Sequence, residues 1–297
     1  MNSIQTLRLE LPADYRCDDF LHYHQRDKSM LAEQVTDNRL NKGILWQGVP
    51  ARIEICLLQT SARLELHLDG KCKINKDYFF HFANRILGLH QTINEFEHTY
   101  KSHSELGPLI AQKPGLRVNL SASPFEALSW AIIGQQISLN AALSIRRKFI
   151  QLAGQQHSSG LWCYPDEQFC RLLTVEQLRA IGFSNTKALT LITLSDFLAR
   201  NPHALSNPNM DAATFAEISA QLLQIRGIGP WTVHYGLLRG FGWLDGSLHG
   251  DIAVRRNLQK LLGTDTTISE QAAREWLSAF SPWRALVAAH LWAMQNA

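Results

Sequence analysis

The sequence lacks the features that would place it in several special classes of protein. Its longest apolar runs fall well short of the ~18–20 residues that a membrane span needs. The first ten residues show no basic stretch followed by an apolar one, so we expect no secretory signal. Charged residues make up only 19% of the chain and hydrophobic residues 45%, which excludes a disordered or fibrous protein.

Cysteine is scarce, and the chain carries little excess charge of either sign. The five cysteines are odd in number and scattered, which argues against a disulfide framework and favours a reducing cytoplasm. They are Cys17, Cys56, Cys72, Cys163 and Cys170. The net charge of +3 is compatible with a polyanionic partner but does not require one.

The length of 297 residues is enough for about two domains, and the first, residues 1–98, shows β-type patterning. Residues 52–58 and 62–68 are β-type runs joined by a short polar turn, and the second alternates between apolar and polar positions. Residues 18–30 and 77–87 have helical spacing, with Asp77 as a candidate N-cap of the second. We therefore predict a small antiparallel sheet with helices.

The remainder of the chain has helical spacing almost throughout. Residues 99–123 form a polar connector that we expect to pack with the C-terminal helices. Residues 124–243 then form a helical domain, which 244–297 close. Helices are predicted at 125–133, 140–152, 174–181, 185–200, 211–225, 230–240, 252–262, 269–280 and 283–295. The predicted fold class is therefore α+β, a β-sheet domain followed by an all-α bundle.

A hairpin at residues 222–239 has the composition of a phosphate-binding element. Gly227 and Gly229 let the backbone turn tightly and approach a ligand, and Pro230 begins the second helix where a missing N–H costs nothing. The free N–H groups at that helix N-terminus favour an anion, and Thr232 adds a hydroxyl. Taken alone, the same residues also suit an ordinary corner between two helices.

Five segments of the chain resemble one family in the order in which that family carries them. The hairpin LLQIRGIGPWT and the following FGWLDGSLHGDIAVRRNL are similar to the helix-hairpin-helix element and the aspartate loop of DNA glycosylases. SPFEALSWAIIGQQIS, LRAIGFSNTKALTLITLSDFL and FSPWRALVAAHLW resemble further helices of the DNA-3-methyladenine glycosylase II (AlkA) type. The resemblance covers essentially the whole chain. It implies a helix-hairpin-helix glycosylase bundle behind a small β-sheet domain.

The resemblance assigns the catalytic role to Asp251. By itself, an aspartate between Gly250 and Ile252 is most simply a helix N-cap, and the two roles are compatible. Cleavage of an N-glycosidic bond builds oxocarbenium character at the sugar, which a nearby carboxylate stabilises. Trp231 stands where bifunctional relatives carry a Schiff-base lysine, which favours simple hydrolysis. The alternatives are a bifunctional glycosylase/lyase and a non-catalytic damaged-DNA-binding protein.

The resemblance also implies an aromatic pocket for a flipped base, made by Trp231, Tyr235 and Trp292, although aromatic residues in this pattern also suit a hydrophobic core. Either Phe20 or Tyr23 is expected to close it.

Further residues match positions that contact DNA in the family. Gln136 corresponds to the wedge that fills the gap left by the flipped base; the plainer reading is a polar loop residue. Gly227, Gly229 and Thr232 correspond to the phosphate contacts. The main-chain carbonyls of Leu223, Ile225 and Gly227 correspond to ligands of a structural Na⁺ or K⁺.

No cofactor is expected to take part in the chemistry. Some relatives carry a [4Fe–4S] cluster, and Cys163 and Cys170 have one fitting gap, but four thiolates are needed and no cysteine follows them. We expect the partner to be double-stranded DNA containing alkylated bases, with no membrane partner. We further expect a monomer in the cytoplasm, associated with the nucleoid if the source is bacterial.

Overall fold

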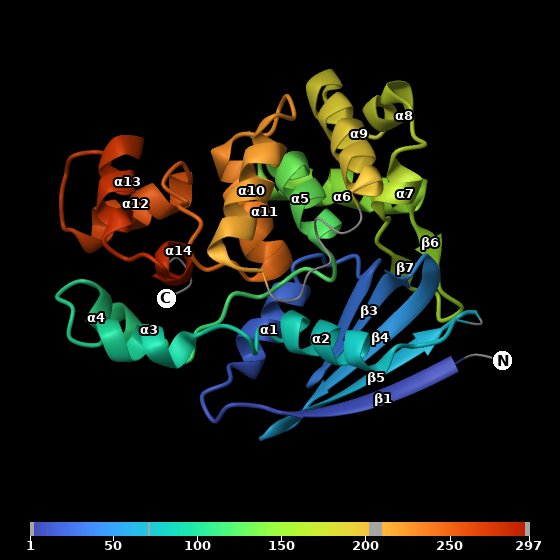
Figure 1. Ribbon diagram of the computed structural model, residues 1–297, viewed down its shortest axis with the longest axis horizontal. Helices are drawn as coiled ribbons and strands as arrows, with labels where there is room; N and C mark the ends of the chain where they lie inside the picture. Colours follow the sequence, from blue (N-terminus) through green and yellow to red (C-terminus); the bar gives the residue numbers. More distant parts are fainter. Residues whose placement is uncertain (1–2, 71, 202–209, 295–297) are drawn as a thin grey trace.

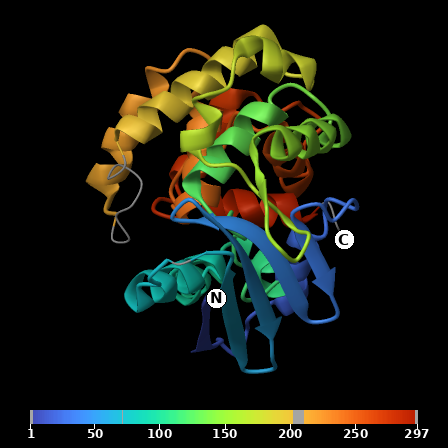
Figure 2. The same cartoon turned by 90° about the vertical axis from the view of Figure 1, so that its right-hand side faces the viewer.

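The structure is a computed structural model that describes residues 3–70, 72–201 and 210–294. An antiparallel sheet lies beneath a helical part in both views of the molecule (Figures 1 and 2). The first part contains β1 (Ser3–Glu10), α1 (Cys17–His24), β2 (Glu33–Thr36), β3 (Arg39–Trp46), β4 (Val49–Leu57), β5 (Ser61–Leu68), α2 (Lys76–Ile86), α3 (Ile93–Tyr100) and α4 (Leu106–Gln112). The second contains α5 (Pro124–Gly134), α6 (Leu139–Ala153), β6 (Gln155–Gln156), β7 (Trp162–Cys163), α7 (Glu167–Cys170), α8 (Val175–Ala180), α9 (Asn185–Arg200), α10 (Ala212–Leu223), α11 (Pro230–Phe241), α12 (Ile252–Leu261), α13 (Glu270–Ser278) and α14 (Arg284–Ala293).

The sheet has five antiparallel strands in the order β1-β5-β4-β3-β2. The predicted hairpin is confirmed as β4 and β5, whose pairing ends at Leu57 opposite Ala62. The alternating leucines of β5 are fully buried and pack with the apolar side of α2, which gives this part of the chain a core of its own. The predicted α+β class is confirmed.

The sequence analysis did not predict β1, β2 or β3, and β3 shows why. It contains Lys42 and Gly43, residue types that disfavour a strand. Gly43 is needed because β7 crosses close by, and a Cβ atom there would lie 2.2 Å from the carbonyl oxygen of Trp162. The short β6–β7 hairpin itself was missed in a part of the chain predicted to be all helical.

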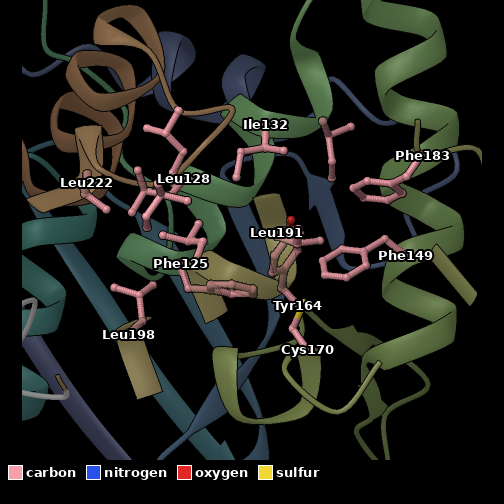
Figure 3. Packing of buried hydrophobic residues seen from close by; sticks show 14 of the residues in the cluster. Phe125, Leu128, Ile132, Phe149, Tyr164, Cys170, Phe183, Leu191, Leu198 and Leu222 are labelled. Atoms are coloured by element: carbon pink, nitrogen blue, oxygen red, sulfur yellow. The ribbon is translucent and has the colours of Figure 1, made fainter. Parts of the chain in front are cut away.

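The helical part follows the predicted pattern closely. Its core joins α5, α6, α9 and α11, and Figure 3 shows Phe125, Leu128 and Ile132 of α5 within it. Ser123 caps α5 by accepting a hydrogen bond from the N–H of Glu126 at 3.0 Å, and Pro124 occupies the first position, as predicted. Within the described residues, no helix combines the length and apolar character that crossing a membrane requires.

Several predicted boundaries differ from the structure. The connector at 99–123 contains α4, whose leucines join α3 and the C-terminal helices in one core. α1 covers Cys17–His24 rather than 18–30. Asn75 caps α2, and Asp77 lies in its first turn. The predicted helix end at 295 falls outside the described residues.

A buried cluster of charges joins the sheet to the helical part. Lys42 of β3 is 1% exposed and donates hydrogen bonds to Glu33 and, at 2.8 Å, to Glu126 of α5. Arg146 of α6 lies 3.2 Å from Glu33 and 3.3 Å from Glu126. Two cations and two carboxylates therefore share this interface.

The four groups of the cluster remain charged because the two positive charges offset the two negative ones. Burial raises the pKa of the Glu33 and Glu126 carboxyls, but the attraction of Lys42 and Arg146 outweighs it and holds both pKa values below their ordinary range. Burial likewise lowers the pKa of Lys42 and Arg146, and the two carboxylates reverse that shift. The cluster fixes the position of α5, which packs against α11 in the site described below (Figure 1).

Candidate active site

Asp251 lies at the N-terminus of α12, where four N–H groups hold its carboxylate. Oδ1 accepts hydrogen bonds from the backbone of Ala253 and Val254 at 2.9 and 3.0 Å and from the Trp292 indole at 3.2 Å. Oδ2 accepts one from the Trp231 indole at 2.9 Å. Oδ1 is crowded with donors, so Oδ2 is the oxygen with acceptor capacity left for a ligand. Asp251 therefore caps α12 through Oδ1 and still has Oδ2 available to a ligand.

Two of the three predicted pocket aromatics contact this carboxylate, and the third, Tyr235, packs beside them. Trp231 and Tyr235, one turn apart on α11, stack with their ring centroids 5.2 Å apart and an interplanar angle of 28°. The ring centroid of Trp292 on α14 lies 6.2 Å from that of Tyr235. Tyr235 is buried, whereas Trp231 and Trp292 are half-buried. Because both indoles donate to Asp251, the rings form part of a polar site as well as of the core.

The far side of the aromatic group holds Arg239, which sequence reasoning missed. Its guanidinium carbon lies 5.0 Å from the ring centroid of Tyr23, 5.3 Å from that of Trp292 and 5.8 Å from that of Tyr235. Of the two predicted N-terminal aromatics, Tyr23 therefore joins the group, whereas Phe20 is buried in the core beside the sheet. The signal available in the sequence was the spacing: positions 231, 235 and 239 are four residues apart, which places Arg239 on the same face of the helix as Trp231 and Tyr235.

Two more residues that the sequence analysis did not single out complete this side. The Trp130 indole donates a hydrogen bond to the Tyr235 hydroxyl at 3.2 Å, and the Arg26 guanidinium lies 3.8 Å from the Tyr23 ring centroid. Burial raises the pKa of the Tyr23 phenol, but Arg26 and Arg239 outweigh burial and lower that pKa overall. The site therefore has a negative end at Asp251 and a positive end beside Tyr23.

The hairpin between α10 and α11 has the predicted shape. Gly227 has a φ of +92°, and a Cβ atom there would lie 2.1 Å from Thr190 Oγ1, so only glycine fits. Gly229 is the N-cap residue of α11 and has no side chain to cap the helix, and the space beside it is open. The first N–H groups of α11 therefore have no intrahelical partner. The Thr232 hydroxyl instead points inward and accepts a hydrogen bond from Gln135 at 2.9 Å.

The three carbonyls proposed for a monovalent cation differ in their surroundings. Ile225 O accepts a hydrogen bond from the N–H of Ile228 at 3.0 Å, and Gly227 O accepts one from Gln135 at 2.9 Å. Leu223 ends α10, where carbonyls lack intrahelical partners. Since each carbonyl oxygen has two lone pairs, oxygen donors for a hard cation remain at this turn.

Comparison with known proteins identifies the family of the chain. The family model described as HhH-GPD superfamily base excision DNA repair protein matches residues 129–282, more than half of the chain, including the hairpin and Asp251. The chain belongs to this superfamily. A Bacillus subtilis (strain 168) DNA-3-methyladenine glycosylase is 24% identical over 94% of this chain and 96% of its own length.

Two solved structures share the fold of this HhH-GPD protein over nearly all of its length. The 3-methyladenine DNA glycosylase from Archaeoglobus fulgidus has a TM-score of 0.80, with 20% identity and 98% of each chain covered. The Clostridium acetobutylicum 8-oxoguanine glycosylase/lyase in complex with double-stranded DNA has a TM-score of 0.73, with 14% identity, 100% of this chain and 98% of its own covered. At these identities the likeness shows the fold alone, including the N-terminal sheet.

The turn between α5 and α6 of this HhH-GPD protein presents the predicted wedge. Gln136 is exposed and has a φ of +54°, and Ile137 beside it is 38% exposed. The turn is tied to the hairpin by Gln135, whose amide bonds both Gly227 O and Thr232 Oγ1. Lys187 donates to Gln135 O at 2.7 Å, so its amine is engaged within the protein.

Packing fixes the loop that leads to Asp251. Leu248 is fully buried, and its carbonyl accepts a hydrogen bond from the Asp251 N–H at 3.0 Å. Asp245 in the same loop forms an ion pair with Arg284 of α14 at 2.8 Å. The loop is therefore anchored to the helix that carries Trp292.

Proposed function

We propose that this protein is a monofunctional DNA glycosylase that flips alkylated bases of the 3-methyladenine type out of duplex DNA and hydrolyses the N-glycosidic bond, leaving an abasic site. The observation that carries the proposal is the Asp251 carboxylate, held by two indole N–H groups at the edge of an aromatic group. The substrate class is supported by the relative from Bacillus subtilis, a DNA-3-methyladenine glycosylase, and by the 3-methyladenine DNA glycosylase from Archaeoglobus fulgidus.

The geometry suggests how the chain supports this reaction. As the bond between C1′ and the base nitrogen breaks, its electron pair leaves with the base and positive charge develops on the sugar. Asp251 Oδ2 stabilises that charge, because the indoles and the helix N-terminus keep the carboxylate fixed in place. Water then adds to C1′ and loses a proton. An alkylated purine that is already cationic leaves as a neutral base, so one carboxylate suffices.

Hydrolysis without lyase chemistry is favoured by the residues around the carboxylate. Among the described residues, the side chains that hydrogen-bond to Asp251 are two tryptophans, and Trp231 occupies the position of the Schiff-base lysine. The Lys187 amine donates to two main-chain carbonyls. A covalent lyase step therefore has no positioned amine. Because the fold is shared with a glycosylase/lyase, fold alone does not decide between the two.

We further propose how the DNA is held. The hairpin binds a phosphate through Gly227, Gly229 and the backbone at Thr232, and Na⁺ or K⁺ on the carbonyls of Leu223, Ile225 and Gly227 adds to that contact. Gln136 enters the gap in the duplex. The protein acts as a cytoplasmic monomer, and no cofactor takes part in the chemistry.

Base release and strand cleavage, measured separately, test the function. We expect duplex DNA treated with a methylating agent to release methylated purines, while its strands stay intact until alkali cleaves the abasic sites. Release followed by enzyme-dependent nicking, with a borohydride-trapped covalent complex, would move the protein to the bifunctional class. Binding to damaged DNA without any release would instead support the non-catalytic alternative.

A substitution at Gly229 tests the phosphate contact without disturbing the hairpin. Gly229→Asp places a good N-cap residue in open space, but its carboxylate bonds the free N–H groups and repels phosphate. We expect affinity for abasic and undamaged duplexes to fall together by roughly tenfold or more, equivalent to ~1.4 kcal/mol. Gly229→Asn is the matched neutral control, and it should lose less. Equal affinity of Gly229→Asp and the wild type would remove the contact.

A further inference from the structure

We propose that Arg239 acts on the departing base: it stabilises bases that leave as anions and gives no such assistance to bases that are already positively charged. The inference rests on the proposed glycosylase function and adds a residue that sets its specificity. Arg239 would be the leaving-group counterpart of Asp251, which acts on the sugar.

The placement of the two charged groups carries the proposal. The indole of Trp292 donates to Asp251 Oδ1 at 3.2 Å, while the Arg239 guanidinium carbon lies 5.3 Å from the Trp292 ring centroid. A single indole therefore separates the carboxylate from the guanidinium. Trp231 and Tyr235 extend along the same helix face from one charge to the other. A nucleoside lying along these rings with its sugar at Asp251 directs its base toward Arg239.

Arg239 is held in place but keeps hydrogen-bonding capacity. Its Nη1 donates to the carbonyl of Asn119 at 2.9 Å. Among the described residues, Nη2 makes no hydrogen bond and is not one of the buried unpaired atoms, so it is the nitrogen that a ligand can reach. None of the ion pairs found in the described residues includes it, in contrast to Arg146, which faces two carboxylates. A guanidinium N–H donates strongly to an acceptor with partial negative charge. An acceptor atom on a bound base can therefore bond Nη2.

The chemistry of departure depends on the charge of the base. A neutral purine such as hypoxanthine takes the electron pair of the C1′–N9 bond and leaves as an anion, which then gains a proton from solvent. A guanidinium fixed beside the base stabilises that developing charge in a site shielded from water. A cationic base such as 7-methylguanine leaves as a neutral molecule, so the guanidinium does not stabilise its departure.

A purely structural role for Arg239 is the alternative that the test must separate. Arg85 provides the matched control, because its guanidinium clamps the same connector to the end of α11 through Ser121 O and Gly240 O, both at 2.8 Å. Its cation–π partner is Phe82, and among the described residues none of its hydrogen bonds or cation–π contacts involves Trp231, Tyr235 or Trp292. Loss of a clamp alone should affect every substrate equally.

The experiment measures single-turnover release of hypoxanthine and of 7-methylguanine from duplexes of otherwise identical sequence. For Arg239→Gln we expect hypoxanthine release to fall by about 10²-fold, as for removal of one oxyanion donor, and 7-methylguanine release to change little. Arg239→Lys, which keeps the charge, should restore part of the hypoxanthine rate. Arg85→Gln should leave the ratio of the two rates unchanged.

Three results would overturn the proposal. They are equal losses on both bases with Arg239→Gln, unchanged release of both, or a wild-type enzyme that releases 7-methylguanine but no hypoxanthine. If Arg239→Gln does not fold, Arg239→Lys decides between the two roles. If the charge of Arg239 matters, Arg239→Lys should lose little hypoxanthine release. If the guanidinium only holds the connector, Arg239→Lys should lose release of hypoxanthine and of 7-methylguanine to the same larger extent. A wild-type protein that releases neither base contradicts the glycosylase function itself, which is a distinguishable result.

Discussion

Asparagine in place of Asp251 is expected to slow base release by about 10²-fold or more, equivalent to ~2.7 kcal/mol of transition-state stabilisation. The amide oxygen can still accept the hydrogen bonds of Ala253 and Val254, so the helix cap is kept. The negative charge beside the sugar is lost. The amide NH₂ then faces the Trp231 indole N–H, which loses its acceptor. Chemistry should therefore suffer far more than folding.

Single-turnover release from methylated duplex, with binding measured separately, tests this expectation. Trp231→Phe is the companion variant, because it removes the same indole hydrogen bond and leaves the carboxylate charged. We expect it to lose less activity than Asp251→Asn. Near wild-type release by Asp251→Asn would exclude the carboxylate as the catalytic group, and equal losses in the two variants would assign the effect to the hydrogen bond.

The second large effect is expected at the buried charge cluster between the sheet and the helices. Lys42→Met leaves Glu33 and Glu126 with Arg146 as their remaining close cation in the cluster. Removing one partner of a buried ion pair typically costs about 3–5 kcal/mol, because the remaining charge is left uncompensated. We expect the free energy of unfolding to fall by that amount in denaturant titrations.

A surface lysine provides the control for this measurement. Lys101 is exposed, and Lys101→Met should change the free energy of unfolding by no more than about 0.5 kcal/mol. A loss below about 1 kcal/mol for Lys42→Met would mean that Arg146 alone balances both carboxylates.

Local signals made much of the helical part predictable. The helix predicted at 185–200 coincides with α9, because Ser184 caps it and polar residues follow it. Ser123 and Pro124 marked the start of α5 in the same way. The place of Asp251 at the start of a helix was predictable from Gly250 before it and the helical spacing after it, and it is the N-cap of α12. Its catalytic role stays a prediction.

Features that depend on distant partners were not predictable in this way. Lys42 contradicts a buried strand unless Glu33 and Glu126 are known to meet it, and Glu126 is 84 residues away. Arg239 reads as an ordinary basic residue until Trp292 and Tyr23 are placed around it. In both cases a tertiary contact decides the environment. The spacing along α11 places Arg239 on the face of Trp231 and Tyr235, but it does not show that Trp292 and Tyr23 lie around it.

The amide of Gln135 has a consequence for how the protein would engage a duplex. One side-chain nitrogen bonds both the carbonyl of Gly227 and the hydroxyl of Thr232, so the turn that presents Gln136 and the turn that faces phosphate are fastened together. In the proposed complex, the protein fixes the distance between Gln136, which enters the duplex, and the hairpin that binds the DNA phosphate. The duplex must then bend and unstack to fit this distance. A lesion that weakens base stacking lowers the free energy that this deformation requires. Flexibility of the DNA, more than motion of the enzyme, would select the sites that are opened.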